Sequence, residues 1–458
     1  MTTEHEPISA ERKDAEPAPQ KPQSSRFGFD RLIQTPLGLI LGVLILLGVY
    51  LRLRDFGYPN SLQFDEHHFV ETARGYLKHQ PDWNDHPPLG KLLIVTGISA
   101  LGDNSVGFRL PALIAGLLTI GLGAYAAHRL FRAKWSASLA AALLAADGFL
   151  IAYSRAALLD GFLVMASLAA LLLVGFEVSL TWGCIAGAIL GFAASVKFSG
   201  IGVLLPLLFA VAISKQRSKQ KLTALTGMGL VAAFVYVSTY GIGLNITGKP
   251  SGVLDVFADT QRLLKHHSDL TDMKNPATSG WSTWFLPKRP LLLGIYEKHG
   301  AVRALTTLGN LATWWSSVAL AVASLVVVSR LGWGRVLKLG ESIASDGEDT
   351  STAQTTVTRF VIGNGPAVIA VLLGAIGFLA PWILTHRDSY IYHFLPAYAP
   401  LVVLLSGFLG WYEQQQPNRV FYFAVLVLLV AAFYAPLWGY MPISSDALSL
   451  RLFLNSWH

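Results

Sequence analysis

The 458-residue sequence has little charge and almost no cysteine. Charged residues make up 14% of it, whereas soluble domains carry about 25%. The single cysteine, Cys184, excludes an intramolecular disulfide and a zinc site built from several cysteines. No glycine-rich phosphate loop follows a predicted strand, so nothing indicates a nucleotide site. The shortage of charge and the mean hydropathy of +0.48 instead place the chain in a lipid bilayer.

Long apolar runs recur along the chain and predict an all-α polytopic membrane protein. About 20 apolar residues are needed to cross a bilayer, and several of the runs are shorter than that. The pattern predicts about eleven transmembrane helices, near residues 36–53, 106–128, 135–151, 158–177, 180–196, 199–214, 222–243, 306–329, 360–385, 390–410 and 419–438.

Basic residues predict which side of the membrane each loop faces. The net charge is +7, and a basic balance can indicate nucleic-acid binding. Here the basic residues cluster in short loops between apolar runs, such as 215–221 and 330–338, which is typical of cytoplasmic loops. We therefore expect the N-terminus in the cytoplasm, the long loops 54–105 and 246–305 outside, and no nucleic-acid partner.

Composition divides the chain into four parts. Residues 1–34 are polar and rich in Pro, Glu, Lys and Ser, which predicts a disordered cytoplasmic tail before an uncleaved membrane anchor. Residues 35–245 are expected to form an N-terminal transmembrane module that contains the first outer loop. The second long outer loop, 246–305, then leads to a C-terminal four-helix module, 306–458. A Ser/Thr-rich acidic stretch, 340–358, predicts a disordered cytoplasmic loop.

The first outer loop holds a dense group of ionisable residues. The spacing of apolar residues in 64–78 predicts an amphipathic helix, with Asp65 and Glu66 at its N-terminus. Carboxylates are favoured there as caps, so the pair fits a structural role as well as a functional one. Pro88 is expected to open a second helix over 89–101, which is too short to span and is expected to lie in the interface.

The same loop offers ligands for a metal ion, and this alternative stays open from the residues alone. Asp65 and His68 are three residues apart and share one helical face. The other candidate ligands are Glu66, His67, Asp85 and His86, with His266 and His267 from the second outer loop.

Seven short motifs occur in order between about residues 50 and 400. They are FDEHHF (64–69), DHPPLGKLL (85–93), FRLPAL (108–113), SRAALLDGFLV (154–164), SVKFSG (195–200), SGWSTWFLPKRPLLL (279–293) and YHFLPAYAP (392–400). Together they resemble protein O-mannosyltransferases, multispanning enzymes of the GT-C glycosyltransferase class. Eukaryotic members carry a large soluble insert in the later outer loop, so this sequence resembles a bacterial member. Two departures are the His-His pair after Asp-Glu and the direct adjacency of Asp85 and His86.

The resemblance implies a GT-C-like fold and a reaction that moves mannose from a polyprenyl-phosphate carrier to Ser or Thr hydroxyls of secreted or membrane proteins, by a single inverting displacement without a metal cofactor. An alcohol needs a base that takes its proton as it attacks. The resemblance points to Asp65 as this base and Glu66 as orienting the acceptor, or the two roles exchanged. Asp85 and His86 are expected beside the acceptor.

A phosphate that leaves as an anion needs cations or N–H donors where its charge develops. Four basic residues lie at the expected outer ends of spans: Arg109, Arg155, Lys197 and Arg387. Each is a candidate for the donor phosphate, and each also fits a basic side chain that extends to lipid headgroups.

Two other functions remain in view. One is a transferase of the same membrane class that glycosylates a lipid or an envelope polysaccharide, since no motif reads the acceptor directly. The other is a lipid or solute transporter. Transporters driven by ions or protons usually carry ionisable residues near the membrane midplane and internal repeats, and both signals are weak here.

Overall fold

The computed structural model describes residues 35–81, 85–270, 276–346, 355–385, 388–452 and residue 457. Within these residues the protein is helical, with one two-stranded sheet. The predicted disordered tail 1–34 and the candidate Arg387 lie outside the described residues.

Seven helices in the described part of the chain are long and apolar enough to cross a membrane. They are α2 (Pro36–Leu53), α5 (Ser105–Phe131), α11 (Ser218–Ile246), α13 (Leu311–Leu331), α16 (Gly365–Leu384), the segment of η4 and α17 (Ile391–Gln415), and α18 (Arg419–Trp438). Helices α6 (Ser136–Ala145) and α7 (Gly148–Arg155) form a pair bent by 60°, which brings the count to eight if they form one span. The chain is therefore a multi-pass membrane protein.

The predicted count of eleven spans is not confirmed. Three of the predicted spans fall on shorter apolar helices, namely α8 (Asp160–Leu172), α9 (Leu180–Val196) and η1 (Phe198–Val203) with α10 (Leu204–Ile213). Helix α8 has 13 residues and α9 has 17, less than the roughly 20 that a straight crossing needs. Each predicted span nevertheless coincides with an apolar helical segment.

The bend between α6 and α7 is held by a buried aspartate. Asp147 accepts hydrogen bonds from the N–H groups of Phe149 and Leu150, so α7 begins with an internal cap. Its second carboxylate oxygen accepts from the Tyr398 hydroxyl and the Asn310 N–H, both at 2.9 Å. The structure therefore places this aspartate at the break between the two helices.

The two helices predicted in the first outer loop are confirmed. Helix α3 covers Glu66–Leu77, and α4 covers Leu89–Leu101 with Pro88 at its N-cap position. Helix α3 buries Phe69, Val70 and Ala73, which is the face that the spacing of apolar residues predicts.

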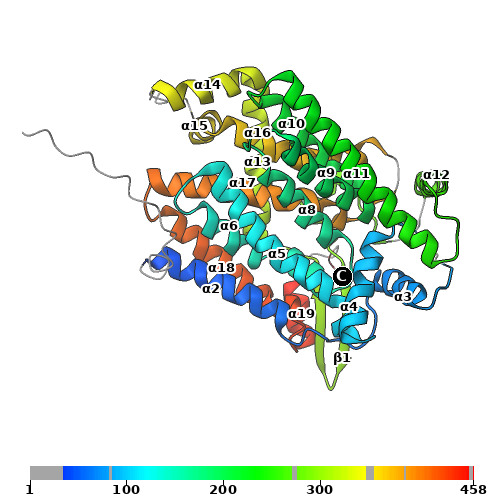
Figure 1. The fold of residues 1–458 in the computed structure, drawn as a ribbon. Helices are drawn as coiled ribbons and strands as arrows, with labels where there is room; N and C mark the ends of the chain where they lie inside the picture. Colours follow the sequence, from blue (N-terminus) through cyan, green and yellow to red (C-terminus); the bar gives the residue numbers. More distant parts are fainter. Residues whose placement is uncertain are drawn as a thin grey trace, which may run out of the picture.

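The second outer loop contains structure that the sequence did not predict. Helix α12 (Val253–Asp269) is amphipathic, and β1 (Leu292–Lys298) pairs antiparallel with β2 (Ala301–Thr306). In Figure 1 the hairpin lies at the same end of the molecule as α3 and α4, and α12 is viewed along its axis beside them. The end that carries the outer loops is therefore built from α3, α4, α12 and the hairpin.

The end of the molecule opposite the outer loops carries two short helices. Helix α19 lies at the other end, near the hairpin. Helices α14 (Trp333–Asp346) and α15 (Thr356–Gly363) lie together at the top left of Figure 1. Helices α14 and α15 overlap the two ends of the stretch 340–358 that was predicted to be disordered, so that prediction was wrong for 340–346 and 356–358, while 347–354 lie outside the described residues. Helix α19 (Ser445–Arg451) follows a short bridge between Ile443 and Val302 of β2.

Candidate active site

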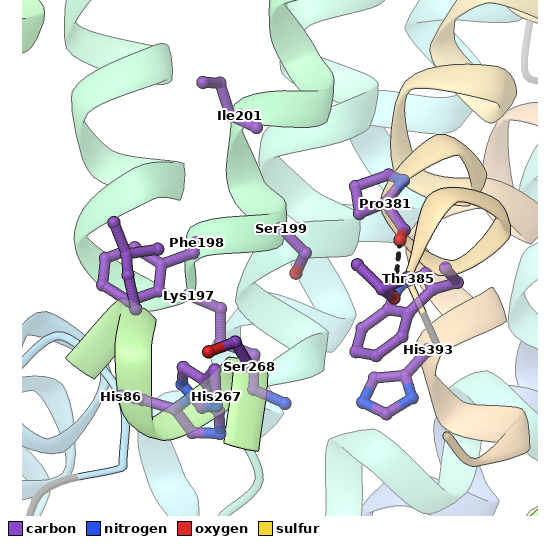
Figure 2. A pocket seen from close by; sticks show the side chains of 12 residues that line it. His86, Lys197, Phe198, Ser199, Ile201, His267, Ser268, Pro381, Thr385 and His393 are labelled. Atoms are coloured by element: carbon purple, nitrogen blue, oxygen red, sulfur yellow. Dashed lines mark hydrogen bonds between the residues drawn. The ribbon is translucent and has the colours of Figure 1, made fainter. Parts of the chain in front are cut away.

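A cavity of about 530 Å³ opens at the end of the bundle that carries the outer loops. This volume lies within the range of about 300–1,000 Å³ that is usual for small-ligand sites. Figure 2 shows Lys197, His86 and His267 on one side and His393 with Pro381 on the other. Its lining residues are His86, Lys197, Phe198, Ser199, Ile201, Leu264, His267, Ser268, Pro381, Trp382, Thr385 and His393. The cavity thus combines charged and polar groups with an apolar wall.

Lys197 enters the cavity wall from the end of α9, where it is the C-cap residue. Its ammonium lies 2.8 Å from Oδ2 of Asp160, the first residue of α8. The two side chains are only 7% and 5% exposed. The Lys197 ammonium also lies 5.2 Å from the ring centre of Tyr392, within cation–π range. A paired cation is therefore held at the surface of the cavity.

Asp65 lies at the N-cap position of α3, but its side chain makes no capping hydrogen bond to the helix. The preceding residue, Phe64, has a left-handed backbone with φ of 45°, an uncommon conformation for a bulky residue. Burial raises the pKa of the Asp65 carboxyl to about 6, and the nearby charges of Lys197 and His68 oppose this rise. A carboxyl with a pKa near 6 is well placed to take up a proton at neutral pH.

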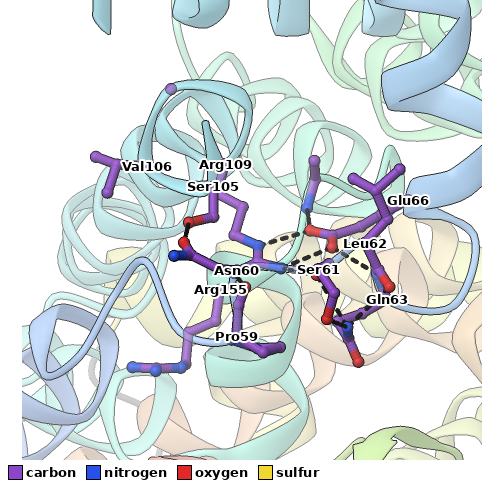
Figure 3. A network of polar contacts seen from close by, with 12 residues as sticks. Pro59, Asn60, Ser61, Leu62, Gln63, Glu66, Ser105, Val106, Arg109 and Arg155 are labelled. Carbon is purple, nitrogen blue, oxygen red and sulfur yellow. Dashed lines mark hydrogen bonds and ion pairs between the residues drawn. The ribbon is translucent and has the colours of Figure 1, made fainter. Parts of the chain in front are cut away.

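Glu66 is fully buried and forms a two-pronged ion pair with Arg109 of α5. Both N–O distances are 2.8 Å, from the Arg109 Nε and Nη2 atoms to the two Glu66 oxygens. The Glu66 oxygens also accept from the N–H groups of Gln63 at 2.9 Å and Ala157 at 2.7 Å. Figure 3 shows this network below the start of α5. Glu66 thereby ties the first outer loop to α5 and to the segment after α7.

The other hydrogen bonds of Arg109 go to the protein backbone. Its Nη1 donates to the Pro59 carbonyl at 3.0 Å and its Nη2 to the Ser61 carbonyl at 3.1 Å. The side chain is 1% exposed. Because these partners surround the guanidinium, it has no surface left for a ligand. Arg109 was predicted to bind the donor phosphate, but it does not line the cavity.

Arg155 is also engaged with backbone. Its guanidinium donates to the carbonyls of Leu51, Arg54 and Asp55 at the end of α2, with distances of 2.8 Å to Arg54 and 3.3 Å to Asp55. These are carbonyls that a helix C-terminus leaves without partners inside the helix. Arg155 thus closes the end of α2 and does not line the cavity. Of the four predicted phosphate ligands, Lys197 is the one that the described residues place at the cavity.

Asp85 and His86 lie where the first outer loop meets α12. His86 lines the cavity and stacks on His267 with ring centres 5.2 Å apart. Asp85 Oδ1 lies 3.4 Å from Nε2 of His266. Lys91 of α4 donates to the His86 carbonyl at 2.8 Å and fixes the loop between them. The two outer loops are therefore in contact through these four residues.

The described residues contain no group of three or more His, Cys, Asp or Glu side chains that is arranged to hold a metal ion. Of the residues that the sequence offered as ligands, Asp85, His86, His266 and His267 come together. Glu66 is instead buried against Arg109, and His67 and His68 are exposed.

Three residues of the site were not singled out from the sequence. Asp160 belongs to the motif SRAALLDGFLV, and His393 to YHFLPAYAP, but their motifs alone do not give them a role. Trp382, near the C-terminal end of α16, stacks on His393 with ring centres 3.6 Å apart. The signal that would have found Asp160 is its charge at the start of an otherwise apolar run, because a buried charge needs a partner.

Two family models match consecutive parts of the chain. The model described as dolichyl-phosphate-mannose-protein mannosyltransferase matches residues 42–245, and the one described as the C-terminal four-transmembrane region of protein O-mannosyltransferase matches residues 254–457. The chain is 25% identical to the polyprenol-phosphate-mannose–protein mannosyltransferase of Mycobacterium tuberculosis, over 92% of this chain and 91% of that protein. The enzyme of the same name from Mycolicibacterium smegmatis is also 25% identical, over 91% of this chain and 92% of that protein.

Solved structures share the fold. The protein O-mannosyltransferase Pmt1–Pmt2 complex of S. cerevisiae, bound to the sugar donor, has a TM-score of 0.71 at 14% identity and covers 94% of each chain. ArnT from Cupriavidus metallidurans has a TM-score of 0.51 at 14% identity, over 91% of this chain and 75% of that one. The family models together span most of the chain, and the relatives match it nearly end to end. The chain belongs to the protein O-mannosyltransferase family of membrane glycosyltransferases.

Proposed function

We propose that this protein transfers mannose from a polyprenyl-phosphate carrier to Ser or Thr hydroxyls of protein segments, at the outer face of the cell membrane. The observation that carries the proposal is the placement of Asp65, a partly buried carboxyl with a pKa near 6, within electrostatic range of Lys197 at the cavity wall. Asp65 is not itself a lining residue of the cavity, but the charge of Lys197, which lines it, reaches Asp65. A base and a cation near one another are the two groups that the reaction needs. The names of the mycobacterial relatives support the same donor and acceptor.

In this reaction the acceptor hydroxyl attacks the anomeric carbon of mannose while the bond from that carbon to the phosphate oxygen breaks. Asp65 takes the hydroxyl proton, and polyprenyl phosphate leaves as an anion. Lys197 lies where it can stabilise the negative charge that grows on the phosphate. A single displacement of this kind inverts the anomeric carbon, and it needs one base because the phosphate leaves without protonation.

Glu66 and Arg109 receive a different role from the one that sequence reasoning gave them. Because Glu66 is 0% exposed and its oxygens accept four hydrogen bonds, we assign it to holding the loop that carries Asp65. Arg109 is its partner in this task. The base is therefore Asp65, and the two carboxylates do not exchange roles.

The apolar wall of the cavity fits the isoprenoid part of the carrier. Phe198, Ile201 and Leu264 line it, and Leu264 and Ile201 are about half exposed at its edge. Helix α12 exposes Leu254 and Phe257 as well, as expected for a helix at the membrane interface. A lipid-linked sugar phosphate combines an anion with an apolar chain, which matches this mixture of Lys197 and apolar residues.

The test is transfer by the purified protein in lipid nanodiscs, supplied with polyprenyl-phosphate-[³H]mannose and a Ser/Thr-rich peptide. We expect label on the peptide, lost in Asp65→Asn. Asp103→Asn is the matched control, since Asp103 is an exposed acidic residue of the same loop that pairs with Arg74. Label found on lipid or on added polysaccharide, with none on peptide, would favour the other transferase reading. No transfer to any acceptor by the wild type would defeat the proposal.

A further inference from the structure

The buried ion pair of Lys197 and Asp160 is not explained by the stability of the fold. A buried ion pair seldom stabilises a protein more than apolar residues of similar volume would, because both charges lose their hydration. Asp160 makes no helix-capping hydrogen bond in α8, where Leu159 holds the N-cap position. Its carboxylate bonds to Lys197 at 2.8 Å. The pair therefore calls for a functional reason.

Lys197 bonds to one carboxylate, Asp160, and its charge also acts on a second, Asp65. Asp65 is close enough for the Lys197 charge to act on its protonation, and Asp160 holds the ammonium directly. An ammonium has three N–H donors, and Asp160 takes one of them. A lysine without Asp160 would be drawn to Asp65, and an ion pair there would weaken the carboxyl as a base.

We infer that Asp160 is a positioning residue that holds the Lys197 ammonium at the cavity wall, where it meets the donor phosphate and leaves Asp65 available as the base. This inference rests on the proposed function, because it assigns roles within the same transfer reaction. Asp160 itself does not line the cavity. It acts through Lys197, which does.

Four charged side chains act on the protonation of Asp65. Lys197 and His68 favour its charged form, whereas Asp160 and Asp85 disfavour it. The Tyr153 hydroxyl of α7 also feels the charges of Asp65 and Asp160. The remaining titratable groups at the cavity are His86, His267 and His393. The acid limb of the pH–rate profile is the part in which the rate falls as Asp65 becomes protonated. Removing Asp160 should move it to lower pH, and removing Lys197 should move it to higher pH. A purely structural role would not produce these opposite shifts.

The experiment measures kcat/KM for polyprenyl-phosphate-mannose against pH, in nanodiscs, for four proteins: wild type, Asp160→Asn, Lys197→Met and the double variant. We expect Asp160→Asn to shift the acid limb down by about half a pH unit or more, since a negative neighbour is lost and Lys197 turns toward Asp65. Lys197→Met should shift it up, and the double variant should return toward wild type. Both single variants should raise the donor KM by about fivefold or more.

Asp147→Asn is the matched control, because it makes the same change in a buried aspartate at the break between α6 and α7, away from the cavity lining. It should leave the acid limb in place. Asp160→Glu should restore the wild-type limb and most of the donor affinity. If Asp160→Asn does not fold, the double variant removes both charges together and is compared with Lys197→Met alone. Its acid limb should lie lower by about half a pH unit or more.

An acid limb and a donor KM that Asp160→Asn leaves at wild-type values would overturn the inference. So would identical acid limbs in Lys197→Met and the double variant. These failures differ from failure of the proposed function, in which the wild-type protein itself would put no mannose on the peptide.

Discussion

Replacing a carboxyl by an amide is predicted to have opposite effects on the stability of the folded protein at two adjacent residues, Asp65 and Glu66. The pKa of Asp65 rises from 3.8 to about 6 in the folded protein, chiefly through burial. Each pKa unit corresponds to about 1.4 kcal/mol, so the ionised carboxylate costs up to about 3 kcal/mol. Partial exposure of Asp65 reduces this, and we expect Asp65→Asn to stabilise the folded state by about 1–3 kcal/mol at pH 7.5 while it abolishes transfer.

The sign of this effect depends on pH. Because the folded-state pKa is raised, the penalty vanishes as pH falls below 3.8, where the carboxyl becomes protonated in both states, and it builds up between about pH 4 and pH 6. The stability difference between Asp65→Asn and the wild type should therefore be small near pH 4, grow up to about pH 6 and stay constant above it. Thermal unfolding of both proteins in the same detergent, from pH 4 to pH 8, measures the difference.

Glu66→Gln is the control at the next residue. It replaces an acceptor of four hydrogen bonds by an amide and leaves Arg109 without its buried counter-charge. Breaking a buried pair in this way costs about 3–5 kcal/mol, so Glu66→Gln should lower the unfolding temperature. The reasoning would be refuted if Asp65→Asn lowered the stability at pH 7.5, or if Glu66→Gln left it unchanged.

Four further predictions follow from the same geometry. Arg109→Ala should lose about 3–5 kcal/mol of stability, whereas Lys197→Met should mainly raise the donor KM; a folded Arg109→Ala protein with wild-type stability and a raised donor KM would reverse these assignments. Below a pH of about 6, kcat/KM should fall about tenfold per unit as Asp65 is protonated, and a flat profile down to pH 5 would exclude it as the base. Transfer should survive removal of divalent metal by a chelator, and its loss there would favour a metal-dependent reaction. Gly377→Val should lower the unfolding temperature, because a side chain there would overlap the backbone of Gly202 where α16 meets η1, and an unchanged temperature would show that the two segments separate at no cost.

The first outer loop was predictable because its local signals agree with one another. Helical spacing, an acidic N-terminus and the Pro-Pro pair all indicate two short helices, and α3 and α4 begin within two residues of the predicted positions. The apolar segments were predictable for the same reason. The number of helices that cross the membrane completely was not predictable. Helices α8 and α9 are too short to cross alone, and only packing distinguishes a crossing helix from a buried one.

The roles of the arginines were not predictable, because a sequence does not report which backbone carbonyls lack partners. Arg109 and Arg155 follow the pattern of basic residues at span ends, which is equally typical of headgroup contacts and of phosphate ligands. The structure instead bonds Arg155 to the end of α2 and Arg109 to Glu66 and the loop. Those carbonyls lie about 50 to 100 residues away in the sequence, beyond the reach of any local motif.

No helix was predicted in the second outer loop, because the helix that forms there, α12, has a weak inward face. Helix α12 buries only Val256 and Leu263 along that side, while Leu254 and Phe257 point outward. In a soluble protein, a helix with so few buried apolar residues is expected to be unstable. At a membrane surface the outward residues gain an apolar environment, so the same pattern is stable. Helix α12 then brings His266 and His267 against Asp85 and His86, a meeting that neither loop shows alone.

The two arginines and Lys197 differ in the hydrogen-bond partners that their roles require. A guanidinium in a low-dielectric region is best satisfied by several fixed acceptors in one plane, and Arg109 and Arg155 use their forks to lock the loop and the end of α2. A phosphate that arrives and leaves needs a cation that keeps donors in reserve. Lys197, held by one carboxylate and the face of Tyr392, meets this requirement. We therefore propose that the arginines hold the site together and that Lys197 binds the donor phosphate.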